Sequence, residues 1–298
     1  MRLVAVIALL TLTSPVGAQD FWKHWGDGQA EVNGYRLTQP RYGEDRQGTA
    51  VLIYVTEDFS DRLRVKADPG RHPAPETYPV LKLNAVRDFN TGVYDYNIMT
   101  STFLRVADGW PVAKVSFSSQ EWCGHVWHQI VPRGDGIGGV YHSYFDGEAD
   151  GEADGEENLE RPEGGVFEDA LPIILRGWKG AFLAPGESRT VPFLPSLLHS
   201  RLQHEPLAWV SATVSRATES TTVQVPAGTF EVTVYTVAVS DGRVLTFAFE
   251  TAVPHRLVRQ TGPGGEELVL TGSKRMPYWR LNANGGEKHL KEIGLGDD

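Results

Sequence analysis

Three residues near the middle of the chain have types and spacing that could support chemistry. The stretch Ser118–Gln129, SSQEWCGHVWHQ, contains Cys123, the only cysteine, followed by His125 and His128. Thiolate and imidazole groups bind zinc and copper, so Cys-x-His-x-x-His is a candidate metal site. On a regular strand, however, side chains alternate between faces, and Cys123 and His125 would point away from His128. Without a bulge at Gly124 to change the register, we expect no metal site here.

A nucleophilic site is the second candidate in this stretch. On one continuous strand, Glu121, Cys123 and His125 share a face. The opposite face, which is the candidate core row, carries Trp122, Val126, His128 and Ile130. A thiol with an imidazole base and an orienting carboxylate would suit a hydrolase or transferase. Neighbours on one face lie about 7 Å apart at Cα, which is long for a direct hydrogen bond. The pattern favours a structural strand, with Cys123, His125 and Glu121 catalytic only under the alternative that the protein is an enzyme.

Standard catalytic motifs are missing from the rest of the sequence. It has no Gly-x-Ser-x-Gly elbow, no His-Glu-x-x-His, no Walker loop and no Cys-x-x-Cys. The glycine-rich segment Gly134–Gly139 lies between two candidate strands, which predicts a hairpin turn rather than a dinucleotide-binding loop. We therefore expect no cofactor, and we favour a non-enzymatic protein.

The elements that must position these residues are mostly strands, because β-branched and aromatic runs are bounded by turn residues. The predicted strands are 49–58, 78–89, 93–107, 112–122, 125–131, 139–145, 208–220, 221–240, 242–251, 255–262 and 266–275. Alternation is clearest in Val244–Glu250, where Leu245, Phe247 and Phe249 share one face. Short helices are predicted within Phe167–Trp178 and Phe193–Leu202.

These elements predict a mainly β fold. One large, strongly curved antiparallel sheet, an open half-barrel wrapped around one or two short helices, would bury the apolar face of every strand at once. Two packed sheets are the alternative. Phe21–Trp25, FWKHW, is expected to tie the start of the domain onto the sheet. The tail after Asn284 is expected to fray.

The first residues have the pattern of an export signal. Arg2 precedes the apolar run Leu3–Leu12, and Val16–Ala18 forms a small-residue cleavage site. The run is too short to span a bilayer, and no other stretch is long enough. The residue directly after the cleavage site is Gln19 and not a cysteine, so it cannot accept a lipid anchor. We expect a cleaved signal peptide at 1–18, a single β-rich domain at 19–298, and a periplasmic or secreted protein without a transmembrane segment.

The net charge of −10 comes from one segment. Residues 146–169 hold eleven acidic side chains and one arginine, so the remainder is electroneutral and offers no basic surface to nucleic acid. The spacing of acids in the Asp-Gly-Glu-Ala repeat differs from that of an EF-hand. Composition therefore predicts a flexible, solvated acidic loop at 146–165.

The last part of the chain resembles a known family. Residues 221–279 contain Val-Pro-Ala-Gly-Thr-Phe at 225–230, Pro-x-Arg-Leu-Val-Arg at 254–259 and Glu-Leu-x-Leu at 267–270. This segment resembles the carboxy-terminal part of the DUF3108-like family of uncharacterised exported bacterial proteins. The amino-terminal half, with its segments 42–60 and 118–129, resembles exported proteins sometimes labelled septum formation inhibitors. The resemblance implies an open half-barrel similar in shape to bacterial lipoprotein carriers, and it implies no reaction.

The expected function follows from export, from the curved sheet and from the lack of a complete catalytic motif. We expect a non-enzymatic protein of the bacterial envelope that binds a lipid or other hydrophobic small molecule in the concave face of its sheet. The alternative is a hydrolase or transferase that uses Cys123 with His125 and Glu121.

Overall fold

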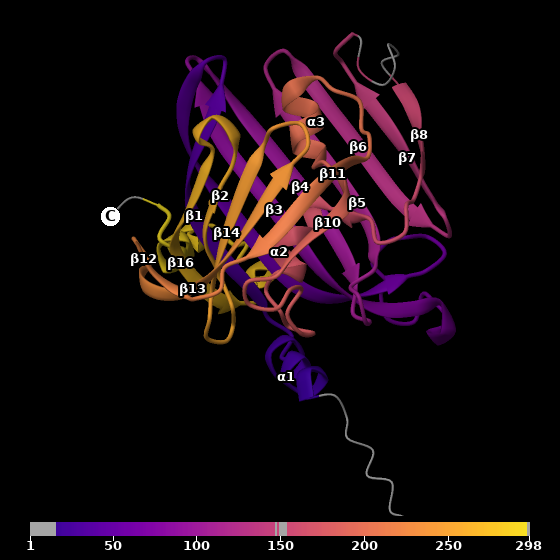
Figure 1. The fold of residues 1–298 in the computed structure, drawn as a ribbon, viewed down its shortest axis with the longest axis horizontal. Helices are drawn as coiled ribbons and strands as arrows, with labels where there is room; N and C mark the ends of the chain where they lie inside the picture. Colours follow the sequence, from indigo (N-terminus) through magenta and orange to yellow (C-terminus); the bar gives the residue numbers. More distant parts are fainter. Residues whose placement is uncertain (1–15, 147, 149–153, 297–298) are drawn as a thin grey trace, which may run out of the picture.

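A single sheet of sixteen strands organises the described part of the chain (Figure 1). The structure is a computed structural model that describes residues 16–146, 148 and 154–296. The strands are β1 (Ala30–Arg41), β2 (Glu44–Ser60), β3 (Thr77–Thr91), β4 (Tyr94–Arg105), β5 (Val112–Glu121), β6 (Gly124–Arg133), β7 (Gly136–Ser143), β8 (Asp154–Glu160), β9 (Val166–Phe167), β10 (Ser188–Leu194), β11 (Val210–Arg216), β12 (Thr221–Val225), β13 (Gly228–Val239), β14 (Val244–Glu250), β15 (Leu257–Thr261) and β16 (Glu267–Met276).

Helical elements are short and few. The α-helices are α1 (Val16–Trp25), α2 (Leu171–Ile174) and α3 (Leu197–Gln203), and the 3₁₀ turns are η1 (Ala74–Glu76), η2 (Glu168–Ala170), η3 (Pro263–Gly265), η4 (Tyr278–Arg280) and η5 (Gly286–Ile293). Helix α2 lies inside the predicted segment Phe167–Trp178, and α3 overlaps the predicted segment Phe193–Leu202 but ends one residue later, at Gln203, while Phe193 and Leu194 belong to β10. None of the helices in the described part of the chain is long and apolar enough to cross a membrane.

The sheet consists of two meanders that meet at the first and last strands. Strands β1 to β8 are neighbours in chain order, and β16 pairs with β1 and continues through β15, β14, β13, β11 and β10 to β9. Its two edges, β8 and β9, are not paired with each other among the described residues, so the sheet stays open. The predicted fold class is confirmed, with one exception: β9 and β10 are parallel over two residue pairs.

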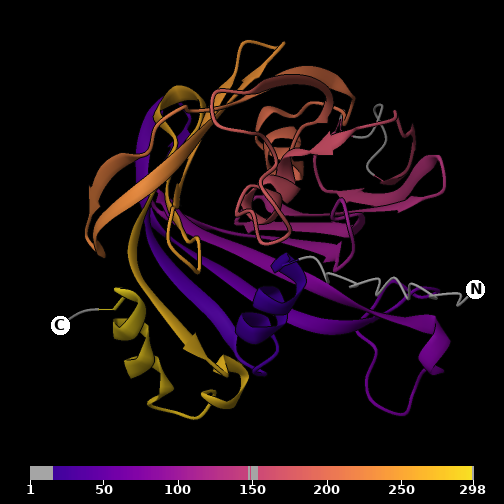
Figure 2. The same ribbon diagram turned by 60° about the horizontal axis from the view of Figure 1, so that its bottom comes forward.

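The sheet curls around α2 and α3 (Figure 2). Inward-facing Leu83 of β3 and Phe247 of β14 belong to the same core cluster as Leu197 of α3, so strands from both meanders pack on the helices. In β14, Leu245, Phe247 and Phe249 are buried as predicted. Helix α3 begins where the Ser196 hydroxyl accepts a 3.0 Å hydrogen bond from the His199 N–H. The N-cap fixes the residue at which α3 begins, and the buried side chains of both meanders form the surface on which α3 packs.

Helix α1 fixes the start of the described chain to the sheet, as predicted for Phe21–Trp25. Phe21 and Trp25 are fully buried, and the Phe21 ring contacts Trp110 at 5.6 Å and Trp178 at 6.2 Å between centroids. The helix begins at Val16, and most of the predicted signal peptide, residues 1–15, lies outside the described residues.

The acidic segment is more structured than its composition predicts. The prediction of a solvated loop at 146–165 is wrong for Asp154–Glu160, which forms β8 and pairs antiparallel with β7. The apolar side chain of Leu159 packs against the core, which holds the strand in register. Glu148 is buried. Residues 147 and 149–153 of the acidic repeat lie outside the described residues.

Two further features were missed or mispredicted at the seam between the meanders. Strand β1 was not predicted, because Gly34 and Pro40 interrupt its pattern. The prediction of a frayed tail is wrong, since η5 docks on the seam and the Thr271 hydroxyl donates a 2.9 Å hydrogen bond to the Ile293 carbonyl. Gly34 and Gly272 face each other across β1 and β16, and a Cβ at Gly272 would lie 2.5 Å from the Ile293 backbone. The two glycines let the tail approach the sheet closely.

Candidate functional site

The stretch around Cys123 is a hairpin, not one strand. Glu121 ends β5 and pairs with Gly124, which starts β6, so Trp122 and Cys123 form a two-residue turn. The prediction that Glu121, Cys123 and His125 share one face of a continuous strand is therefore wrong. Because the turn reverses the chain, Glu121 and His125 point to opposite faces of the sheet, whereas the prediction placed them on the same face.

The side chains of this hairpin divide differently from the prediction. Val126, His128 and Ile130 are buried as expected, but Glu121 joins their inward face. Trp122, predicted to face the core, is 72% exposed at the turn. His125 is exposed on the outer face of the sheet, and Cys123 is an exposed free thiol at the tip. Only the core row of the second strand matches the predicted arrangement.

The environment of Cys123 disfavours its nucleophilic form. Glu121 Oε2 accepts a 2.8 Å hydrogen bond from the Cys123 N–H, and the side-chain hydrogen bond to Glu121 raises the pKa of the thiol. The thiol therefore stays protonated near neutral pH, whereas the thiolate is the nucleophile. No interaction among the described residues joins Cys123 to His125. A catalytic role for Cys123, His125 and Glu121 remains a prediction from their residue types.

Glu121 instead belongs to a buried charged cluster that anchors α3. Arg201 of α3 lies 3.7 Å from Glu121 and 3.4 Å from Glu148, and all three side chains are buried. The Tyr141 hydroxyl donates a 2.5 Å hydrogen bond to Glu148, and His204 Nδ1 lies 2.7 Å from it. A buried guanidinium shared by two carboxylates ties α3 to β5 and to the chain beyond β7. Its role is structural.

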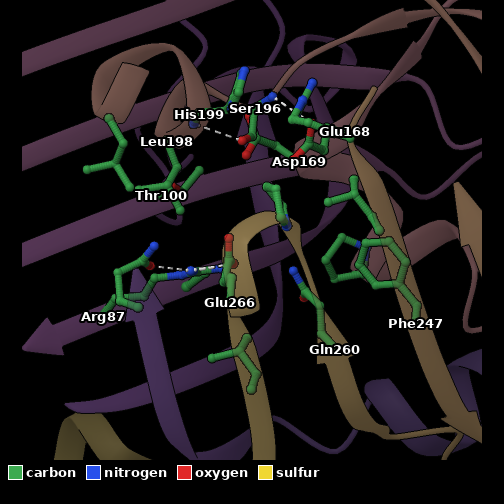
Figure 3. Close-up of a pocket in the computed structure, with 18 of the residues that line it drawn as sticks. Arg87, Thr100, Glu168, Asp169, Ser196, Leu198, His199, Phe247, Gln260 and Glu266 are labelled. Carbon is green, nitrogen blue, oxygen red and sulfur yellow. Dashed lines mark hydrogen bonds and ion pairs between the residues drawn. The ribbon is translucent and has the colours of Figure 1, made fainter. Parts of the chain in front are cut away.

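A cavity of about 240 Å³ lies inside the curve, between the helices and the concave face of the sheet (Figure 3). Its walls come from both meanders, from η2, α2 and α3, and from the β15–β16 turn. The lining residues are Gln39, Pro40, Leu52, Leu83, Ala85, Arg87, Thr100, Thr102, Glu168, Asp169, Pro172, Ser196, Leu198, His199, Leu202, Gln203, Arg243, Leu245, Phe247, Gln260, Pro263, Gly264, Glu266 and Leu268. About half of these side chains are apolar, so the site combines an apolar wall with polar groups.

One polar group of the cavity is an ion pair between the two meanders. Arg87 of β3 donates a 2.7 Å hydrogen bond to Glu266, next to β16, and a 2.9 Å hydrogen bond to Gln39 of β1. Arg87 and Gln39 are buried. The pair neutralises both charges at one side of the cavity.

The second polar group surrounds the start of α3. Arg243 donates a 2.9 Å hydrogen bond to Glu168, and Glu168 also accepts one from the Ser196 N–H at 3.2 Å. The neighbouring Asp169 accepts a 3.1 Å hydrogen bond from the Leu197 N–H. Figure 3 shows Glu168, Asp169, Ser196 and His199 grouped together, apart from Arg87 and Glu266.

Two titratable groups in this second cluster have shifted pKa values. Burial, followed by repulsion from Glu168, raises the pKa of Asp169 to about 7. Burial, followed by repulsion from Arg243, lowers the pKa of His199, which keeps the imidazole neutral. A carboxyl group that titrates near neutral pH inside a cavity is a recognised mark of a functional site.

The cavity also presents hydroxyl and amide groups that form no hydrogen bond to another described residue. Thr100 and Thr102 of β4 are 7% and 1% exposed, and their hydroxyls line the cavity. The side-chain amide of Gln260 in β15 lines it as well. Buried polar groups are normally satisfied, so these side chains are available to a ligand or to water.

The sequence placed Leu245 and Phe247 on one strand face, but it identified none of the cavity residues as part of a site. They come from segments that are distant in the chain, and no local motif unites them. The one available signal was Glu168-Asp169 at the start of a predicted helix, and acidic residues there are ordinary in a first helical turn.

Comparisons with known proteins identify no relative by sequence. No protein-family model matches the chain, and no curated protein matches it significantly. Among solved structures, it is similar to a β-barrel-like protein of a domain of unknown function, DUF1849, from Brucella abortus. The TM-score is 0.48 with 14% sequence identity, over 83% of this chain and 98% of the other.

Proposed function

We propose that this chain is an exported, non-enzymatic binding protein of the bacterial envelope, whose interior cavity holds a small molecule with an apolar body. The observation that carries the proposal is the cavity between α2, α3 and the concave face, where apolar side chains lie beside polar groups that have no hydrogen-bond partner among the described residues. Binding sites of proteins commonly combine apolar walls with placed polar groups, and this cavity does so with about equal numbers of each.

The size of the cavity restricts the ligand. At about 240 Å³ it is smaller than the roughly 300–1,000 Å³ typical of sites for drug-sized molecules. A single short alkyl chain or a small ring fits this volume, whereas a diacyl lipid does not. Leu83, Leu198 and Phe247 supply the apolar contacts, from β3, α3 and β14 respectively.

Export is proposed from the pattern of residues 1–18, with Arg2, the apolar run and the small residues at Val16–Ala18. A purified secreted or periplasmic fraction that begins at Gln19 in amino-terminal sequencing would support this part of the proposal. Retention of residues 1–18 in the mature protein would contradict it.

The binding function is tested by asking what the full chain carries when it is purified. Small molecules extracted from the wild type with organic solvent are identified by mass spectrometry and compared with those from Ala85→Phe. Ala85 lines the cavity, so phenylalanine there fills it. The matched control is Val86→Phe, whose neighbouring position on β3 lies on the outer face of the sheet.

We expect a bound species in the wild type and in Val86→Phe that is missing from Ala85→Phe. The same species in all three proteins would contradict a site in the cavity.

A further inference from the structure

The side chains that line the cavity include more acidic groups than guanidinium groups. Two guanidinium groups, Arg87 and Arg243, face three carboxyl groups, Glu168, Asp169 and Glu266. Each guanidinium is already paired with a carboxylate, Arg87 with Glu266 at 2.7 Å and Arg243 with Glu168 at 2.9 Å. The cavity therefore has no unpaired cation among its described residues, and Asp169 is the carboxyl group left over.

A further carboxylate strengthens this imbalance from outside the cavity. Asp241 accepts a 2.8 Å hydrogen bond from Nε of Arg243, so this guanidinium is shared between two acids. The two carboxylates already neutralise the positive charge of Arg243, so a third anion would gain little from binding to it. The site consequently disfavours ligands with a carboxylate or phosphate head group.

Asp169 has free hydrogen-bonding capacity. A carboxyl group offers about four lone-pair positions, and the described residues use one, through the Leu197 N–H at 3.1 Å. The charged and titratable groups that line the cavity with Asp169 are Glu168 in η2, His199 in α3, Arg87 in β3, Arg243 before β14 and Glu266 before β16. No described side chain donates a hydrogen bond to Asp169.

The remaining unpartnered groups can accept hydrogen bonds. The buried hydroxyls of Thr100 and Thr102 and the amide oxygen of Gln260 are acceptors on the cavity wall. An alkylammonium group has only donors to offer and carries the charge that the site lacks. Its chemistry complements an unpaired carboxylate beside neutral acceptors.

We infer that the ligand of this cavity is a small amphiphilic amine, whose ammonium group is received by the carboxylate of Asp169 while its apolar body lies against Leu83, Leu198 and Phe247. This rests on the proposed binding function, which it makes specific. The ammonium pairs with Asp169 as a salt bridge inside the cavity, and no covalent step is involved.

The pH dependence of binding follows from the carboxyl group. With the pKa of Asp169 at about 7, the ionised fraction falls from about nine-tenths near pH 8 to about one-tenth near pH 6. Burial, followed by repulsion from Arg243, lowers the pKa of His199, so this imidazole gains a proton less readily than an ordinary histidine as the pH falls. The affinity for an amine should therefore weaken about tenfold between these two conditions.

The test uses three probes that share one alkyl chain and differ in head group: octylamine, 1-octanol and octanoate. Each is titrated calorimetrically into the full chain, the Asp169→Asn variant and the cavity-filling Ala85→Phe variant. Near pH 8 we expect octylamine to bind wild type at least about tenfold more tightly than octanoate, because opposite charges attract strongly in a sheltered site. Asp169→Asn should remove this preference and the pH dependence, while 1-octanol binds both proteins equally at either pH.

The outcomes separate the two proposals. Binding of 1-octanol that Ala85→Phe abolishes, with octanoate as tight as octylamine, would overturn the amine and leave the cavity as a binding site. Absence of binding by all three probes would overturn both. A preference for octylamine that survives in Asp169→Asn would also overturn the role of this carboxyl group. Should the variant not fold, the affinity of the wild type for octylamine near pH 8 and near pH 6 tests the same role, and equal affinities would overturn it.

Discussion

Replacing Asp169 by asparagine should stabilise the protein at neutral and alkaline pH, although the residue forms a hydrogen bond in the fold. Asparagine has nearly the same shape, and its amide oxygen can still accept the hydrogen bond from the Leu197 N–H. What it removes is a carboxylate that must lose its hydration when the sheet closes over it.

The magnitude follows from the pKa. The carboxyl group has an ordinary pKa of 3.8 in the unfolded chain and about 7 in the fold, so the folded state binds its proton more tightly. The favourable contribution of Asp169 is complete below about pH 4 and is lost as the pH rises through 7. At roughly 1.4 kcal/mol for each pH unit between the two values, the penalty near pH 8 is at most about 4 kcal/mol. Asp169 retains some exposure to solvent, which lowers this penalty, so we expect about 2–4 kcal/mol.

Urea unfolding of the wild type and Asp169→Asn near pH 4 and near pH 8 measures this difference. The variant should have the higher free energy of unfolding near pH 8 and a similar one near pH 4. Asp241→Asn is the control of opposite sign: burial opposes ionisation of Asp241, but hydrogen bonds from Arg243 outweigh it and lower its pKa, so this variant should be less stable near pH 8. Equal stability of wild type and Asp169→Asn at both pH values would refute the reasoning.

Three further predictions concern the scaffold. Arg201→Met removes the guanidinium that the buried Glu121 and Glu148 share and should lower the free energy of unfolding by about 3–5 kcal/mol. Arg189→Met breaks an exposed pair and should change the free energy of unfolding by less than about 1 kcal/mol, and equal effects of the two variants in urea unfolding would contradict a structural cluster. Gly272→Ala forces a Cβ against the Ile293 backbone and should lower the free energy of unfolding by about 1–3 kcal/mol and expose η5 to proteolysis. In the control Gly138→Ala the new Cβ meets open space, so η5 should stay protected. Protection of η5 in both variants would contradict close packing of the tail. The Cys123 thiol should react with iodoacetamide near pH 7 more slowly than the thiol of an unstructured cysteine peptide, because its pKa is raised. The free energy of unfolding of Cys123→Ser should lie within about 0.5 kcal/mol of the wild-type value. Rapid alkylation of Cys123 would favour the enzymatic alternative.

Periodicity was enough to predict the class of fold and several of its parts. Alternation in Val244–Glu250 identified a buried face. The predicted strand 221–240 is instead two strands, β12 and β13, because the chain turns at Pro226 and Gly228, where Gly228 has a φ of 136°. These are local properties of the backbone and of neighbouring side chains. They do not depend on which distant segment packs against them.

The hairpin at Trp122–Cys123 shows where a local pattern misled. Both turn residues belong to types common in strands, so the apolar run reads as continuous. Gly124 at the fourth position of the turn was the signal for a reversal, and it had been considered only as a bulge. A single unrecognised turn moved Glu121 to the inward face, where Arg201 pairs with it.

The cavity was beyond local reasoning for a different reason. Arg87, Asp169 and Gln260 are separated by long stretches of chain and meet only because the sheet curls. The pKa of Asp169 depends on burial by residues from both meanders, which no spacing in the sequence encodes. Buried polar groups of this kind are recognised only once the tertiary packing is known.

The most direct test of the central claim is to locate a bound probe by nuclear magnetic resonance. Octylamine is titrated into isotopically labelled full chain, and the signals of Thr100, Leu198 and Gln260 inside the cavity are followed with those of Met99 and Trp127 on the outer face of the sheet. We expect saturable shifts at the three cavity residues and none at the two outer ones. Shifts confined to Met99 and Trp127, or no saturable shift at Thr100, Leu198 and Gln260, would contradict a ligand site inside the sheet.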